Sequence, residues 1–70
     1  MNIQEAVKKA LESDKCIYRK SEKVKGIDIF IKPTRSKWEC CLLILPNKKE
    51  SSFRWNPTTE DLIATDWELI

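Results

Sequence analysis

The chain has 70 residues, the size of one domain, and 13 Lys and Arg against 11 Asp and Glu give it a formal net charge of +2. Residues 1–35 hold nine basic and five acidic side chains (+4), and residues 36–70 hold four and six (−2). This asymmetry is too mild for a nucleic-acid-binding protein, whose basic excess is usually much larger. The sequence has no histidine, which excludes a histidine-activated nucleophile and a Cys/His zinc site within one chain.

The cysteines and the apolar segments indicate where the protein works. There are three cysteines, an odd number, and Cys40 and Cys41 are adjacent, so the pattern does not resemble a disulfide framework. The charged N-terminal stretch lacks the apolar centre of a signal peptide. The longest apolar run, 40–45, is too short to span a bilayer. We therefore expect a reduced, cytoplasmic protein with no membrane partner.

The short length of the chain also bears on whether it self-associates. A domain of this size buries only about 60% of the surface that its unfolded chain exposes, so its stability margin is thin. Disulfides and metals, two usual supplements, are not indicated by the sequence. We expect a homo-oligomer, a dimer or a tetramer, to complete the core.

The N-terminal half predicts a helix followed by strands. Apolar residues recur at helical spacing from Ile3 to Leu11, and we expect a helix over 3–13 that Asn2 caps. Residues 16–19 predict a short strand. Residues 20–26 are polar and rich in lysine, which favours a loop. Isoleucines then alternate with other residues over 27–32, the period of a strand, which Pro33 ends.

The C-terminal half predicts more strands and one short helix. The run 38–45 is expected to place Trp38, Cys40, Leu42 and Ile44 on one face and the alternating residues on the other. A turn leads to a strand over 52–55, and a short helix follows, capped by Asn56 or Thr58. Residues 66–70 are expected to form the last strand, with the end of the chain in the core. The single domain 1–70 is thus predicted to be α+β: an N-terminal helix packed on a small antiparallel sheet of four to five strands, with a short helix before the last strand.

Several polar groups are candidate sites with plain structural alternatives. The acidic residues Glu60, Asp61, Asp66 and Glu68 could bind a metal or act as acid and base, or could complement a helix terminus and a solvated strand. The cations of 19–25 could bind phosphate or could form a solvated loop. All three cysteines are interpreted as packed in the core. We predict no catalytic residue, no metal ligand and no cofactor.

The three tryptophans could stack on a ligand or fill the core and an interface. Trp55 is the best ligand candidate, because it stands just before the Asn56-Pro57 break, where a side chain can face a pocket. We expect that pocket to be a cleft between subunits, beside Trp55 and Arg19.

Two blocks of the sequence resemble a known family. Met1-Asn2-Ile3-Gln4-Glu5-Ala6 running to Leu11, then Ile17-Tyr18-Arg19, is similar to its opening, and Trp55-Asn56-Pro57-Thr58 followed by Asp61-Leu62-Ile63-Ala64-Thr65-Asp66-Trp67 is similar to its ending. The family is that of the Thoeris anti-defense 2-like proteins of phages and mobile elements. The chain departs from it at 20–23, where members usually have a Gly-Trp-Asn-Gly-like turn, and in the shortened middle section at 33–37.

The resemblance implies a function. Characterised members are oligomers that bind nucleotide-derived immune signals, such as cyclic ADP-ribose isomers and cyclic dinucleotides, and sequester them without cleavage in the host cytoplasm. By position, Arg19, Asn56, Asp61 and Asp66 match polar motif residues, and with Trp55 they form the predicted ligand site. Two alternatives stay open: a protein-interaction module with no small ligand, and an enzyme that uses Asp61 or Asp66 with a metal.

Overall fold

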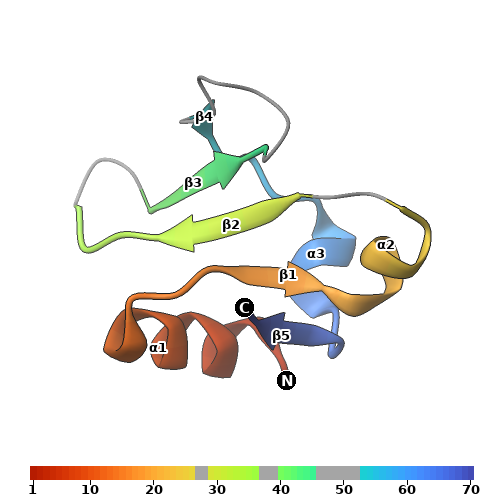
Figure 1. The fold of residues 1–70 in the computed structure, drawn as a ribbon, viewed down its shortest axis with the longest axis horizontal. Helices are drawn as coiled ribbons and strands as arrows, with labels where there is room; N and C mark the ends of the chain where they lie inside the picture. Colours follow the sequence, from red (N-terminus) through yellow and green to blue (C-terminus); the bar gives the residue numbers. More distant parts are fainter. Residues whose placement is uncertain (27–28, 37–39, 46–52) are drawn as a thin grey trace.

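The computed structural model describes residues 1–26, 29–36, 40–45 and 53–70 (Figure 1). Within them the helices are α1 (Ile3–Ser13), α2 (Lys20–Val24) and α3 (Thr59–Ile63), and the strands are β1 (Ile17–Arg19), β2 (Phe30–Pro33), β3 (Cys41–Ile44), β4 (Phe53–Arg54) and β5 (Trp67–Leu69). The strands form one antiparallel sheet in the order β4-β3-β2-β1-β5. The predicted α+β fold, with its first helix, its antiparallel sheet and its short helix before the last strand, is confirmed.

Helix α1 begins and ends where the sequence predicts. The side chain of Asn2 accepts a hydrogen bond of 2.8 Å from the backbone N–H of Glu5, which satisfies one of the free donors of the first turn. Asp14 ends the helix in the left-handed conformation (φ 53°). Ala6 and Ala10 are buried on the face turned to the sheet. Their small side chains let the helix backbone approach the strands closely.

The core lies between α1 and one face of the sheet. Ile17 on β1 pairs with Ile31 on β2 and with Leu69 on β5, so these side chains share a face. The buried set consists of Ala6, Ala10, Ile17, Ile31, Cys41 and Trp67. Tyr18 and Phe30 lie on the opposite face, where their rings meet edge to face at 6.1 Å.

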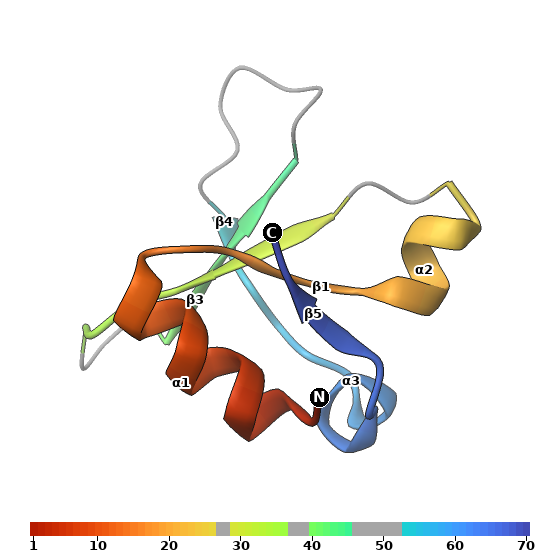
Figure 2. The same ribbon diagram turned by 60° about the horizontal axis from the view of Figure 1, so that its bottom comes forward.

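The two ends of the chain lie side by side. The amino group of Met1 donates to the carbonyl oxygens of Thr65 (3.0 Å) and Trp67 (3.1 Å), and the N–H of Trp67 donates to the carbonyl of Met1 (3.1 Å). Figure 2 shows the start of α1 next to α3. These bonds cover the outer edge of β5 at Trp67, which is 2% exposed. The prediction that the chain's end belongs to the core holds for Trp67 and, in part, for Leu69, whereas Ile70 is 51% exposed and lies outside β5.

The structure corrects the prediction of a loop over 20–26. Lys20 to Val24 form α2 instead, although Arg19 gives no side-chain cap. Asp66 caps the helix: its carbonyl accepts from the N–H of Lys20 (3.0 Å), and its carboxylate accepts from the N–H of Ser21 (3.0 Å). A carboxylate at the positive end of a helix also interacts favourably with the helix dipole. The loop prediction is wrong because the cap comes from the other end of the chain.

Three further details correct the predictions for the C-terminal half. Strand β3 starts at Cys41, and its core face carries Cys41 and Leu43, whereas Cys40 precedes the strand and is exposed. Thr58, and not Asn56, caps α3; it forms a reciprocal capping box with Asp61. The predicted strand positions 27, 28, 38 and 52, together with Trp38, lie outside the described residues.

The other strands lie where the sequence predicts them but are shorter: Ile29 precedes β2, Trp55 follows β4, and β5 covers only Trp67–Leu69. Cys16 is half-buried and directly precedes β1, and β2 ends at Pro33. Among the described residues, the helices are too short or too polar to span a bilayer.

The tight contact of α1 with the sheet predicts the effect of enlarging an alanine. We expect Ala10→Leu to lower the free energy of unfolding by about 1–3 kcal/mol, because the added atoms have no space against the core. Lys9→Leu, one residue earlier on the exposed side of α1, should change it by less than about 0.5 kcal/mol. Urea unfolding of both variants measures this. Equal effects would contradict the packing of α1.

Candidate functional site

Arg19, the last residue of β1, holds three carboxylates around its guanidinium. Its Nε lies 3.2 Å from Oδ1 of Asp66, and its Nη1 lies 3.3 Å from Oδ1 of Asp61. Glu22, one turn into α2, approaches Nη1 at 3.7 Å. The side chains of Arg19 and Asp61 are only 16% and 15% exposed. Arg19 therefore joins β1 and α2 to α3 and the start of β5.

The electrostatics of this Arg19 cluster (Arg19, Glu22, Asp61 and Asp66) follow from its geometry. Hydrogen bonds from Ser21, followed by the bond and charge of Arg19, hold the pKa of Asp66 well below its usual value and outweigh burial. Burial by itself would lower the pKa of Arg19, but the hydrogen bonds and charges of Asp66, Asp61 and Glu22 raise it. With one cation and three carboxylates, the cluster carries a formal charge of −2.

Two tryptophans stand beside the Arg19 cluster. The indole Nε1–H of Trp67 donates to the carbonyl of Asp61 at 2.9 Å, so the buried ring has a fixed orientation. Trp55 meets Trp67 edge to face, with ring centroids 5.8 Å apart and planes at 83°. The backbone N–H of Trp55 donates to the carbonyl of Cys41 at 3.0 Å, which fixes Trp55 to β3.

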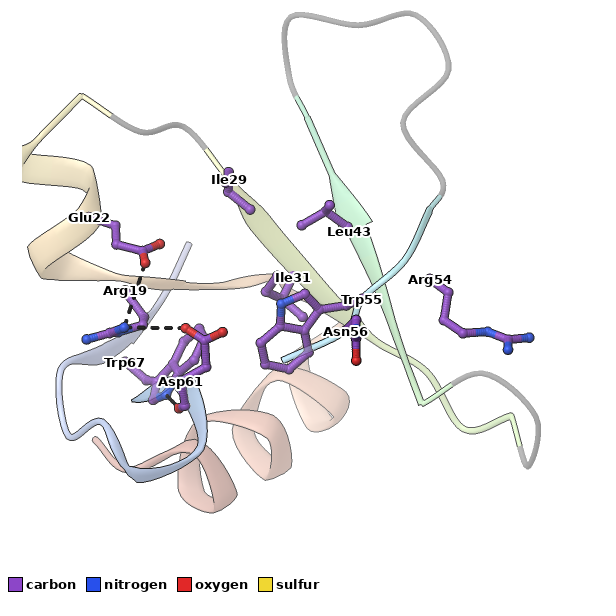
Figure 3. Close-up of a pocket in the computed structure, with 10 residues that line it drawn as sticks. All are labelled: Arg19, Glu22, Ile29, Ile31, Leu43, Arg54, Trp55, Asn56, Asp61 and Trp67. Carbon is purple, nitrogen blue, oxygen red and sulfur yellow. Dashed lines mark hydrogen bonds and ion pairs between the residues drawn. The ribbon is translucent and has the colours of Figure 1, made fainter. Parts of the chain in front are cut away.

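A pocket of about 340 Å³ opens between these groups and the sheet (Figure 3). Its apolar side is formed by Ile29, Ile31 and Leu43, and its polar end by Arg19, Glu22 and Asp61. Trp55 and Trp67 form the aromatic wall, and Asn56 and Arg54 complete the lining. In Figure 3 the guanidinium of Arg54 points away from Trp55 and from the other lining side chains. The volume is at the low end of the roughly 300–1,000 Å³ that small-molecule sites occupy.

The structure brings most of the predicted site residues together. Arg19, Trp55, Asn56 and Asp61 all line this pocket, inside one chain. Asp66 does not; it lines a second, more open hollow of about 470 Å³ together with Ser21 and Ile63. The role of the predicted site residues in binding a ligand stays a prediction. The sequence places the ligand in a cleft between subunits, whereas this pocket lies within one chain, and the function proposed below uses the pocket within one chain.

Sequence reasoning misses part of the pocket. Glu22 falls within the predicted loop, and only a helix starting after Arg19 brings it back to the guanidinium at i+3. Trp67 lies in the core, as the sequence predicts, but its role as the support of Trp55 depends on a contact that no spacing reveals.

The second alternative, complementing a helix terminus, holds for Asp61 and Asp66, and the structure adds a role that the sequence does not reveal. Asp61 and Asp66 surround a guanidinium, and each also caps a helix. The described residues contain no group of three or more Cys, Asp or Glu side chains that could hold a metal ion. Arg19 already has carboxylate partners, so it is not the free phosphate-binding cation that the run 19–25 suggests.

Comparison with known proteins identifies the family. The model of the Thoeris anti-defense 2-like domain matches residues 1–70, the whole chain, so the chain belongs to this family. Membership implies an anti-defense role of the kind found in phages. Among curated proteins and among solved structures, no match to the chain is found.

The Arg19 cluster predicts how stability depends on pH. Because the folded-state pKa of Asp66 is depressed, the ionised carboxylate stabilises the fold above its unfolded pKa of about 3.9, and this contribution is lost as the pH falls below that value. We expect Asp66→Asn to lower the free energy of unfolding at about pH 7, and the gap to the parent protein to shrink by about pH 3.

Urea unfolding at both pH values measures the gap. Glu12→Gln, with the same change of charge on the exposed end of α1, is the control and should leave stability nearly unchanged. An equal gap for Asp66→Asn at both pH values would contradict the assigned ion pair.

Proposed function

We propose that this chain is a non-catalytic phage anti-defense protein that binds and sequesters a nucleotide-derived immune signal, a cyclic ADP-ribose isomer or a cyclic dinucleotide, in the pocket beside Trp55. The observation that carries the proposal is the pairing of an aromatic wall with a polar end in one hollow of about 340 Å³. Bases stack on aromatic side chains whatever their sequence identity. Family membership supplies the anti-defense context.

The charge of the pocket orients such a ligand. The polar end, formed by Arg19, Glu22 and Asp61, has a formal charge of −1, so a phosphate there would meet net repulsion. The carboxylates of Glu22 and Asp61 are instead suited to accept hydrogen bonds from a base amino group or a ribose hydroxyl. The base and ribose would then lie inside, against Trp55, and the phosphates toward the open side, near Asn56.

Sequestration needs no chemistry at the ligand. The chain has no histidine, and Asp61 and Asp66 are committed to Arg19 and to helix caps, which disfavours either as a general base. We therefore propose a binder that works without a cofactor, a nucleic acid or a membrane, in the cytoplasm of the host.

Self-association forms a second part of the proposal. Val24, Ile63 and Leu62 are 82%, 72% and 52% exposed, which is aliphatic surface that another chain could cover. We propose that a second copy covers part of it, giving a dimer or a tetramer. The same surface favours the alternative function, a protein-interaction module with no small ligand.

The main test is recovery of an intact ligand. Purified protein is incubated separately with cyclic ADP-ribose isomers and cyclic dinucleotides, washed, and heated to release bound material for chromatography. We expect at least one of them to be retained and recovered uncleaved, with a matching calorimetric signal. Recovery of none, or of hydrolysed products, would contradict the proposal.

Trp55 provides a sharper test of the site. Trp55→Ala should weaken binding of the retained ligand by about 1–3 kcal/mol, the range of base–aromatic stacking. Tyr18→Leu removes an aromatic ring from the opposite face of the sheet and should bind as the parent does. Thermal unfolding of both variants confirms that each is folded during the titration. Equal affinities of Trp55→Ala and the parent would place the ligand elsewhere.

Sedimentation velocity tests the assembly. We expect a dimer or a tetramer in the micromolar range, and we expect Ile63→Glu to shift it toward monomer. A parent protein that sediments as a monomer at every concentration would contradict self-association and leave the pocket proposal intact, because the pocket lies within one chain.

A further inference from the structure

Cys40 and Cys41 bring two thiols together at the start of β3. Their sulfur atoms lie 3.0 Å apart. Cys41 is 2% exposed and belongs to the core, whereas Cys40 is exposed to solvent. One sulfur can therefore be reached from outside, and the other lies directly behind it.

This proximity is a property of the local backbone. In a regular strand, successive side chains point to opposite faces, which would separate the sulfurs of adjacent cysteines. Here Cys40 lies in a bend, and the strand begins only at Cys41. The carbonyl of Cys40 accepts from the N–H of Thr34 (2.9 Å), and that of Cys41 accepts from the N–H of Trp55 (3.0 Å). The backbone of Cys40 and that of Cys41 are thus each held by a hydrogen bond from a neighbouring segment.

A disulfide between the two cysteines fits this geometry poorly. Disulfides usually join Cα atoms about 4.4–6.8 Å apart. Cα atoms of adjacent residues across a trans peptide are about 3.8 Å apart, and the structure has no cis peptide among the described residues. A direct bond would close a small ring around a planar peptide group, which resists twisting. An atom that bonds to both sulfurs closes a wider ring and therefore distorts the backbone less.

We propose that Cys40 and Cys41 form a vicinal-dithiol site for thiophilic electrophiles with two exchangeable positions, trivalent arsenicals in particular. Thiolates are soft ligands and prefer soft partners. In the reaction with an arsenoxide, two As–S bonds form, both thiol protons pass to the arsenoxide oxygen, and this oxygen leaves as water. Arsenic stays trivalent, so the step needs no oxidant or reductant.

The difference in burial between Cys40 and Cys41 sets the order in which the two As–S bonds form. The thiolate is the reacting form of cysteine. Burial, followed by the hydrogen bond and charge of Cys40, raises the pKa of the Cys41 thiol to about 12, which keeps this thiol protonated at neutral pH. The first bond therefore forms at exposed Cys40, and the second closes onto Cys41 within the same molecule.

Phenylarsine oxide is the probe that tests the site on the full chain. Intact-mass spectrometry should show one phenylarsenic group per chain, and a thiol titration should fall from three free thiols to one, that of Cys16. Excess 2-mercaptoethanol should not remove the group, whereas a dithiol such as dithiothreitol should. Two thiols in one molecule bind arsenic more tightly than two separate thiols do, so only another dithiol can compete with the Cys40–Cys41 pair.

Two variants distinguish the vicinal pair from a site that includes the third thiol. Cys16→Ser should retain the group as the parent does. Cys40→Ser, which leaves the buried Cys41 in the core, should bind it at least about tenfold more weakly in competition with 2-mercaptoethanol, since the chelate is lost. Loss of the group in Cys16→Ser, or equal retention in Cys40→Ser, would overturn the proposal.

Oxidation gives a second, independent readout. Oxidised glutathione, under conditions that modify Cys40, should give the mixed disulfide and not an internal Cys40–Cys41 disulfide in a peptide map. Ready formation of the internal disulfide would overturn the geometric argument for a bridging atom.

Discussion

The Arg19 cluster is the constraint on which the rest of the structure depends. One guanidinium at the end of β1 meets carboxylates from α2, α3 and the segment before β5. Asp61 also accepts the N–H of Thr58 in the capping box of α3, and Asp66 caps α2. Each of these two carboxylates thus stabilises a short helix and fixes that helix to the sheet. The ion pairs and these additional hydrogen bonds therefore join α2, α3 and β1 at one point beside the small core.

The Arg19 cluster determines the shape and the charge of the pocket. The carbonyl of Asp61 orients Trp67, and Trp67 supports Trp55, so the aromatic wall and the polar end are parts of one bonded unit. Because the cluster carries more carboxylates than cations, the polar end is suited to hydrogen-bond donors and unsuited to phosphate. This arrangement supports the proposal of a binder that holds a ligand without acting on it.

Local rules account for most of the fold and for little of the site. Helix α1 and its cap, the strand alternation around Ile17 and Ile31, and the short helix before β5 follow from spacing and capping residues. Helix α2 cannot be predicted by these rules, because the carboxylate that caps it belongs to Asp66. This residue lies 45 positions from Ser21, the residue whose N–H it accepts. The pairing of Arg19 with Asp61 likewise spans 42 residues, and no periodicity reveals it. The resemblance to a family points to these residues, but only the fold shows that they bind one another.

The central claim is that a nucleotide-derived signal binds within one chain, against Trp55, while Arg19 keeps its carboxylates. A crystal structure of the protein grown with a retained cyclic ADP-ribose isomer or cyclic dinucleotide tests this most directly. The account predicts a base stacked on Trp55, donor groups near Glu22 and Asp61, and the phosphates outside the Arg19 cluster. A ligand bound away from Trp55, or a phosphate that displaces Asp61 from Arg19, would contradict it.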